Sequence, residues 1–203
     1  MNTAPPSAPP DGVSGSEQAL ESRIWRLQLD LASGGLRSLL FRGGPVRELI
    51  DPEALPHPFQ LVARGSAGQT AELARFSRGR LRFNQAGAEL AAELVLAAGR
   101  WNLRFRVNAD DALLRVEVVP QGLPEQTAEM GLPLGGAAWV AGAENWMRRE
   151  AGDFQLVVLG SGLVCLPERG SVELGQNPPA RLVLGVVPPG EAAAAAWVRE
   201  NRG

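Results

Sequence analysis

Several segments of the chain alternate between apolar and polar residues with a period of two, which is typical of half-buried β-strands. The first segment starts at Trp25, and the turn Ser33-Gly34-Gly35 follows it. Residues 36–41 form a returning segment, and a second turn, Gly43-Gly44-Pro45, leads into a third short segment over residues 46–50. This order predicts antiparallel strands joined by tight turns.

The clearest alternation lies in the middle of the chain, where a long hairpin is followed by a third strand. The apolar positions of these strands are Leu90, Ala92, Leu94, Leu96, Trp101, Leu103, Phe105, Val107, Leu114, Val116 and Val118. The intervening positions are polar, and we expect their side chains to meet water on the opposite face. The polar set comprises Glu93, Asn102, Arg104, Arg106, Arg115 and Glu117. Such groups can pair across strands for about 0.2–1 kcal/mol each.

The last third of the chain predicts four more strands and one helix. The strands are expected over residues 154–159, 162–166, 171–174 and 180–187, and the helix over residues 191–200. Between residues 121 and 152 the alternation is lost, which predicts a long ordered loop with short strands. About a dozen strands in all predict an all-β fold, an antiparallel two-sheet β-sandwich with a short C-terminal helix.

The domain organisation follows from composition. Residues 1–22 are rich in Pro, Ser and Gly with few large apolar groups, so burial cannot offset the entropy of ordering them. They predict a disordered tail. The remaining residues, 23–203, predict a single β-sandwich domain, since sandwiches of this size occur as one unit.

Charge and targeting signals narrow the classes of partner. All basic residues are Arg, and the formal net charge of the chain is −2. That balance argues against a nucleic-acid binder, which needs a concentrated basic surface. The chain shows neither a signal peptide nor an apolar run long enough to span a bilayer. We therefore expect no nucleic acid, no membrane and a cytoplasmic location.

Residues for catalysis or metal binding are scarce. The chain has one His and one Cys, without a recognised ligand spacing, so we expect no metal and no cofactor. His57 lies between two prolines, which indicates an extended surface segment, although histidine is the usual proton-transfer residue. Cys165 lies in an apolar run typical of a small buried hydrophobe. Ser161, flanked by glycines, is typical of a hairpin turn.

The irregular region contains the best candidates for ligand contact. Trp139 and Trp146 could stack on sugar rings, and Glu129 and Glu144 could accept hydrogen bonds from hydroxyl groups. We predict these four residues as the ligand-binding set and no catalytic set. Packing of both tryptophans in the core is the alternative, as expected for Trp25 and Trp101.

The order of segments resembles the C-terminal β-sandwich domain of family 38 glycoside hydrolases, the α-mannosidases. The resemblance rests on Trp25-Arg26-Leu27-Gln28-Leu29-Asp30, Val46-Arg47-Glu48-Leu49-Ile50-Asp51, Asn145-Trp146-Met147-Arg148-Arg149 and the closing residues 180–190. It implies a galactose-mutarotase-like supersandwich that packs beside a catalytic domain. The catalytic barrel of that family, with its zinc ligands, has no counterpart in 203 residues.

Three functions are therefore open. The first is a non-catalytic carbohydrate-associated β-sandwich domain, which binds a glycan or docks on a glycosidase-like partner protein. The second is a small sugar-modifying enzyme, an epimerase or lyase, that uses His57, an arginine and a loop acid. The third is a structural or assembly module without a ligand. The carbohydrate-associated function rests mainly on likeness of fold. A function has to be argued from the residues of a site, so this one is a hypothesis.

Overall fold

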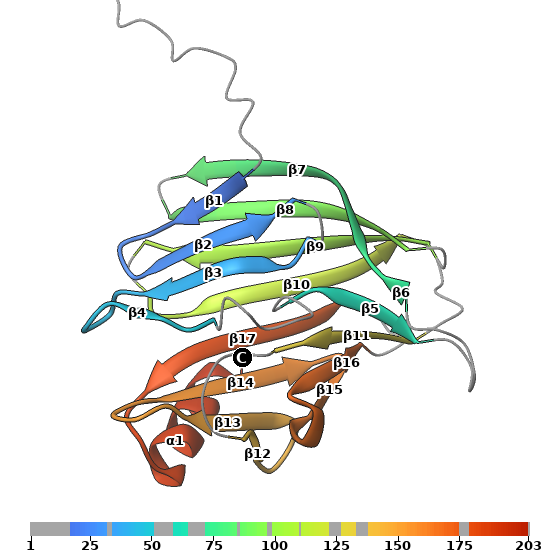
Figure 1. The fold of residues 1–203 in the computed structure, drawn as a ribbon. Coiled ribbons are helices and arrows are strands. Elements are labelled where there is room, and N and C mark those ends of the chain that lie inside the picture. Colours follow the sequence, from blue (N-terminus) through green and yellow to red (C-terminus); the bar gives the residue numbers. More distant parts are fainter. Residues whose placement is uncertain are drawn as a thin grey trace, which may run out of the picture.

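The structure is a computed structural model, and three antiparallel sheets and a C-terminal α-helix make up most of it (Figure 1). It describes residues 17–31, 34–50, 59–64, 72–84, 86–96, 99–109, 111–121, 127–132, 138–174 and 179–202. The predicted all-β antiparallel fold with a short C-terminal helix is confirmed. Its strands form three hydrogen-bonded sheets where two were expected.

The first sheet has four strands in chain order. They are β1 (Glu17–Glu21), β2 (Trp25–Asp30), β3 (Leu36–Phe41) and β4 (Arg47–Glu48). Strand β1 corrects the predicted tail, because its five residues pair in register with β2 and Leu20 is fully buried. Residues 17–21, predicted as part of a disordered tail, are therefore ordered, and residues 1–16 lie outside the described part.

The second sheet has eight strands and is the largest layer. Its spatial order is β12 (Val140–Ala141), β13 (Trp146–Glu150), β14 (Gln155–Ser161), β17 (Ala180–Val187), β10 (Leu114–Gln121), β9 (Gly99–Asn108), β8 (Gly87–Leu96) and β7 (Arg75–Asn84). The hairpin predicted from the middle of the chain is the β8–β9 pair. Strand β7 forms one edge of this sheet and pairs with β8.

The third sheet has five strands drawn from distant parts of the chain. Its order is β15 (Leu163–Leu166), β16 (Ser171–Leu174), β11 (Thr127–Gly131), β5 (Leu61–Arg64) and β6 (Glu72–Leu73). A 3-10 turn, η1 (Pro167–Arg169), joins β15 to β16. The long loop expected over residues 121–152 thus contains three strands, β11, β12 and β13.

One core holds the three sheets together, since buried side chains from all of them belong to the same cluster. The Phe59 ring, just before β5, meets the Phe105 ring of β9 edge to face at 5.7 Å. Gly34, in the β2–β3 turn with φ of 71°, lies so close to Leu94 of β8 that a Cβ there would be 2.2 Å from Leu94 Cδ2. The glycine therefore lets the first sheet approach the second.

The C-terminal helix α1 (Glu191–Asn201) packs on the other face of β14 and β17, away from this core. Val157, Leu159, Ala194 and Val198 are buried in this second cluster with Trp146 and Val187, and Trp197 packs against it. Gln155 Nε2 donates to the carbonyl oxygens of Pro188 and Gly190 at 2.8 and 2.6 Å, which fixes the segment that enters the helix. Among the described residues, no helix has the length and apolar character needed to cross a membrane.

A substitution at Gly185 of β17 tests the packing of α1 against the sheet. A Cβ at Gly185 would lie 2.3 Å from Trp197 Cζ2, so we expect Gly185→Val to push α1 off β17 and to lower the free energy of unfolding by about 1–3 kcal/mol. Chemical denaturation followed by tryptophan fluorescence measures it. Gly44→Ala is the control, because a Cβ there meets no atom within 4 Å. Equal stability of the two variants would contradict the packing.

Candidate functional site

The outer face of the eight-stranded sheet is divided into two halves. On β14 and β17 it carries an apolar cluster, joined by Trp146 of β13, and α1 covers this cluster. On β7 to β10 it is open, and alternate positions carry charged or amide side chains. The arginines of this half and its border with β17 are Arg75, Arg78, Arg80, Arg82, Arg100, Arg104, Arg106, Arg115 and Arg181, and the strand acids are Glu89, Glu93 and Glu117. We call this open half the arginine face.

Strand register aligns the side chains of the arginine face in rows across the sheet. In one row Arg80, Ala91, Arg104, Glu117 and Arg181 are successive cross-strand partners on β7, β8, β9, β10 and β17. Directly opposed residues on one face have Cβ atoms roughly 4.5–5.5 Å apart. Ala91 is the one small side chain of the row, so the surface is lower there than on either side.

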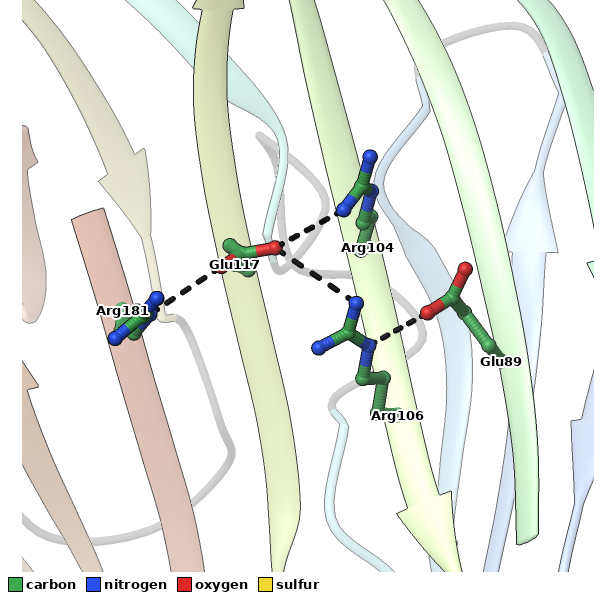
Figure 2. A network of polar contacts seen from close by, with 5 residues as sticks. All are labelled: Glu89, Arg104, Arg106, Glu117 and Arg181. Atoms are coloured by element: carbon green, nitrogen blue, oxygen red, sulfur yellow. Dashed lines mark hydrogen bonds and ion pairs between the residues drawn. The ribbon is translucent and has the colours of Figure 1, made fainter. Parts of the chain in front are cut away.

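Glu117 is the centre of an ion-pair network on this face (Figure 2). Its Oε1 accepts from Arg181 Nε at 3.2 Å, and its Oε2 accepts from Arg104 Nη1 at 3.3 Å. Arg106 Nη2 lies 3.9 Å from the same Oε2, while Arg106 Nε donates to Glu89 at 2.5 Å. The network links side chains of four strands, β8, β9, β10 and β17, as the polar alternation in the sequence predicts.

Glu93 of β8 is a second fixed acid. Its side chain is only 6% exposed, and its Oε2 accepts from Arg78 Nη2 at 2.7 Å and from Arg78 Nε at 3.1 Å. Arg100 Nη1 donates to the other oxygen at 3.3 Å. The hydrogen bonds from Arg78 hold the pKa of Glu93 below its usual value, against the opposing effect of burial. Arg78 and Arg100 are therefore committed to a carboxylate of the chain itself.

A hollow of about 420 Å³ opens over Ala91 on the arginine face. Gly79, Ala91 and Ala92 provide its small residues. Its polar groups are Arg78, Arg80, Arg82, Glu89, Glu93, Asn102, Arg104 and Gln121. Gln121 Nε2 donates to Asn102 Oδ1 at 3.1 Å, so one amide fixes the orientation of the other. A smaller hollow of about 170 Å³ lies on the far side of Arg104, beside Glu117.

Two arginines at the hollow have no acid of their own. Arg80 and Arg82 are exposed on β7, and among the described residues neither makes an ion pair or a side-chain hydrogen bond. Every other arginine of the hollow pairs with Glu93 or Glu117. The hollow therefore has a cationic rim that is free to meet an anion from outside.

The net charge of the chain does not reveal this surface. At −2 the chain is slightly acidic, yet arginines outnumber acids on this one face. The prediction that nucleic acid is absent stays a prediction, and the net charge on which it rests carries no information about this one face. The sequence does contain a sign of the arginine face, because Arg78, Arg80 and Arg82 alternate with Gly79 and Leu81 along β7.

The predicted ligand-binding residues do not gather on this face or on one surface. Trp139 and Glu129 form one pair of neighbours around η1. Trp139 is 8% exposed in the main core, donates from Nε1 to the Leu132 carbonyl at 3.3 Å, and lies against Gly170. Buried Glu129 accepts from Ser171 Oγ at 2.5 Å.

Trp146 and Glu144 form the other pair, beside α1. Trp146 is 6% exposed in the cluster under the helix. Glu144 is exposed, has φ of 60°, and forms an ion pair with Arg202 just after the helix. Both tryptophans are thus packed in apolar clusters, which was the alternative, and the binding of one ligand by the four predicted residues together stays a prediction.

The other candidate groups from the sequence are His57, Ser161 and Cys165. His57 lies outside the described residues. Ser161 is exposed at the end of β14, next to Gly162 with φ of 69°, as expected for a hairpin turn. Burial raises the pKa of the Cys165 thiol to about 11. In the part of the chain that the structure describes, no three His, Cys, Asp or Glu side chains lie close enough to hold a metal ion.

Comparison with known proteins gives likeness of fold only. No family model and no curated protein matches the chain. The periplasmic domain of Thermotoga maritima YidC has a similar fold, with a TM-score of 0.58 and 10% identity over 87% of this chain and 84% of that one. A longer structure of Thermotoga maritima YidC gives 0.59 and 11% identity, and an active YidC insertase gives 0.57 and 10%.

The chain spans about half the length of these two longer YidC structures, 49% and 43%. At such low identity the likeness says nothing about shared chemistry. It also does not bear on the resemblance to the α-mannosidase C-terminal domain, or on a mutarotase-like supersandwich, and both stay expectations.

The lowered pKa of Glu93 makes the stability of the fold depend on pH. Because its folded pKa is lowered, its charge stabilises the fold at neutral pH, and this contribution is lost as the pH falls through the folded pKa. Glu93→Gln should therefore be less stable than wild type at pH 7, and the difference should shrink in acid. Urea unfolding from pH 7 to pH 3 measures it.

Glu200→Gln is the matched control for Glu93→Gln. It removes one exposed carboxylate of α1 that has no ion pair among the described residues, and we expect little change in stability at pH 7. If Glu93→Gln unfolds with the same pH profile as wild type, the Arg78–Glu93–Arg100 cluster does not stabilise the face.

Proposed function

We propose that the chain is a non-catalytic binding domain whose arginine face takes an acidic glycan. The observation that carries this proposal is the pair of exposed arginines, Arg80 and Arg82, which have no partner among the described residues and lie beside a hollow whose other arginines are already neutralised. The proposal narrows the carbohydrate hypothesis drawn from the sequence to sugars that carry carboxylates, and it moves the site from the loop tryptophans to the sheet.

The charge arrangement supports an anionic ligand. A guanidinium can donate two parallel hydrogen bonds to one carboxylate, and such charge-assisted bonds are shorter and stronger than neutral ones. Arg80 and Arg82 lie two residues apart on one strand and so point to the same side of the sheet. They could engage carboxylates on successive units of a chain ligand.

The remaining groups of the hollow suit hydroxyl-rich molecules. Asn102 and Gln121 offer donors and acceptors, and Glu89 offers carboxylate oxygens. The volume, about 420 Å³, lies in the range of small-molecule sites, and its open form would admit the middle of an oligosaccharide as well as an end. None of the described lining residues has an aromatic ring, so binding to them would rely on hydrogen bonds and charge.

Arg80 and Arg82 also have a purely structural interpretation, in which they prevent the edge strand β7 from pairing with another chain. Positive side chains on an edge strand discourage pairing with another chain, and β7 is such an edge. That reading accounts for charge on β7 but not for the hollow behind it, with its oriented amides on β9 and β10. The two interpretations differ in one expected result: a binding site takes up a soluble anion, and a protected edge does not.

A binding experiment separates them. We expect a hexamer of galacturonic acid to bind wild type, and Arg80→Ala/Arg82→Ala to weaken binding by at least about tenfold, because two charge-assisted contacts are lost. Isothermal titration calorimetry at low salt measures the affinity. Arg26→Ala/Arg199→Ala is the charge-matched control, since both arginines are exposed and lie off this face, on β2 and α1.

Two further ligands complete that experiment. Maltohexaose, a neutral hexamer, should bind far more weakly than the acidic one. A hexaglutamate peptide carries similar charge without sugar hydroxyls, and equal binding of it would overturn the carbohydrate part of the proposal. Absence of binding by all three ligands would overturn the proposal as a whole.

A second candidate concerns location and context. A similar fold forms the periplasmic domain of YidC and a part of longer YidC chains, which favours an accessory domain of a larger protein outside the cytoplasm. The cytoplasmic location predicted from the sequence is the competing candidate. Fusion of alkaline phosphatase, which is active only after export, to the natural gene separates them: an active fusion supports the periplasm, and an inactive but expressed fusion supports the cytoplasm.

A further inference from the structure

Arg149 of β13 is a buried cation without a counter-charge. It stands opposite Leu156 on the face of the sheet that is turned toward the core, and its side chain is only 6% exposed. Its neighbour on the same face, Met147, is fully buried in the main cluster. Arg149 is the only basic side chain that is buried among the described residues.

The guanidinium of Arg149 is only incompletely partnered. Its Nε makes no hydrogen bond, and within the described chain no carboxylate lies within ion-pair distance. Burial accordingly lowers the pKa of Arg149. Leaving a buried charge uncompensated is costly, and buried charges in proteins are nearly always paired. The other buried charged groups follow that rule, since Glu93 is paired with Arg78 and Arg100.

Arg149 lies beside an aromatic ring. The Cζ of Arg149 lies 5.9 Å from the centre of the Trp139 ring. That ring is itself held in place, because its Nε1 donates to the Leu132 carbonyl and its edge lies against Gly170. The nearby acid, Glu129 of β11, is engaged with Ser171 and Arg169. The hydrogen-bonded ring and the guanidinium therefore lie side by side.

We propose that Arg149 and Trp139 form a site for the carboxylate of a small organic acid. A planar guanidinium matches a carboxylate with two parallel hydrogen bonds, and the indole and the surrounding apolar side chains suit a hydrocarbon body. One cation neutralises one negative charge, so a monocarboxylate fits better than a phosphate dianion. The site lies on the core-facing side of the sheet and is independent of the arginine face.

The proposal makes a prediction about stability and ligand together. Benzoate should raise the melting temperature of wild type in a saturable way, compared with chloride at equal ionic strength. Arg149→Met should lose this response and, without benzoate, be at least as stable as wild type, because it removes an uncompensated buried charge. Arg149→Lys should retain the charge but bind about tenfold more weakly, because it lacks the planar fork.

Arg148→Met is the matched control. Arg148 is the preceding residue, pairs with Glu150 at 3.0 Å on the other face of β13, and should leave the benzoate response unchanged when replaced. In wild type, benzoate should also shift the indole N–H signal of Trp139, assigned with Trp139→Phe, in a nitrogen–proton correlation spectrum. This second readout does not depend on the folding of any Arg149 variant.

The outcomes that overturn the proposal are distinct from those that support it. No shift of the Trp139 signal and no benzoate-dependent stabilisation of wild type would show that no such site exists. An equal benzoate response in Arg149→Met would place binding elsewhere. Stabilisation by phosphate as strong as that by benzoate would overturn the assignment to a monocarboxylate.

Discussion

The alternation of side chains along β8, β9 and β10 is the constraint on which the rest of the structure depends. One set of positions, with Leu90, Phe105 and Val116 at its centre, is buried in the core that all three sheets share. The other set must then project from the opposite side of the same sheet. A shift of register by one residue would exchange the two sets, so burial of the first set fixes the arginine face.

The opposite side of the sheet is used in two different ways. Where β14 and β17 carry Val157 and Leu159 outward, and Gly185 leaves room for Trp197, the helix α1 covers an apolar cluster. Where β7 to β10 carry arginines, nothing within the described residues covers the sheet, and Glu93 and Glu117 neutralise part of the positive charge. The incomplete neutralisation, at Arg80 and Arg82, makes this half a binding surface in our account.

The sequence predicted much of the fold because strand alternation and turn residues are local signals. Residues 36–41, 171–174 and 180–187 were predicted with the observed bounds of β3, β16 and β17. Strand β1 was missed because its order depends on pairing with β2, which composition does not reveal. The division into three sheets was missed for a similar reason, since β11 pairs with β5 and β16, which are far away in the chain.

The site was harder to predict than the fold. Trp139 and Trp146 are predicted as ligand-binding residues because they are large groups in an irregular region. Only tertiary packing shows that both are buried. Net charge concealed the arginine face, because charge balance over a chain carries no information about its distribution between faces. The period-two arginines of β7 and the unpaired Arg149 become meaningful only when their neighbours across the strands are known.

A nitrogen–proton NMR titration that resolves arginine Nε–H groups, with an acidic oligosaccharide as the ligand, tests the central claim most directly. We expect the largest shifts at Arg80, Arg82 and the Asn102 side chain, around the hollow over Ala91. Shifts confined to other surfaces, such as α1, or no shifts at millimolar ligand, would contradict it.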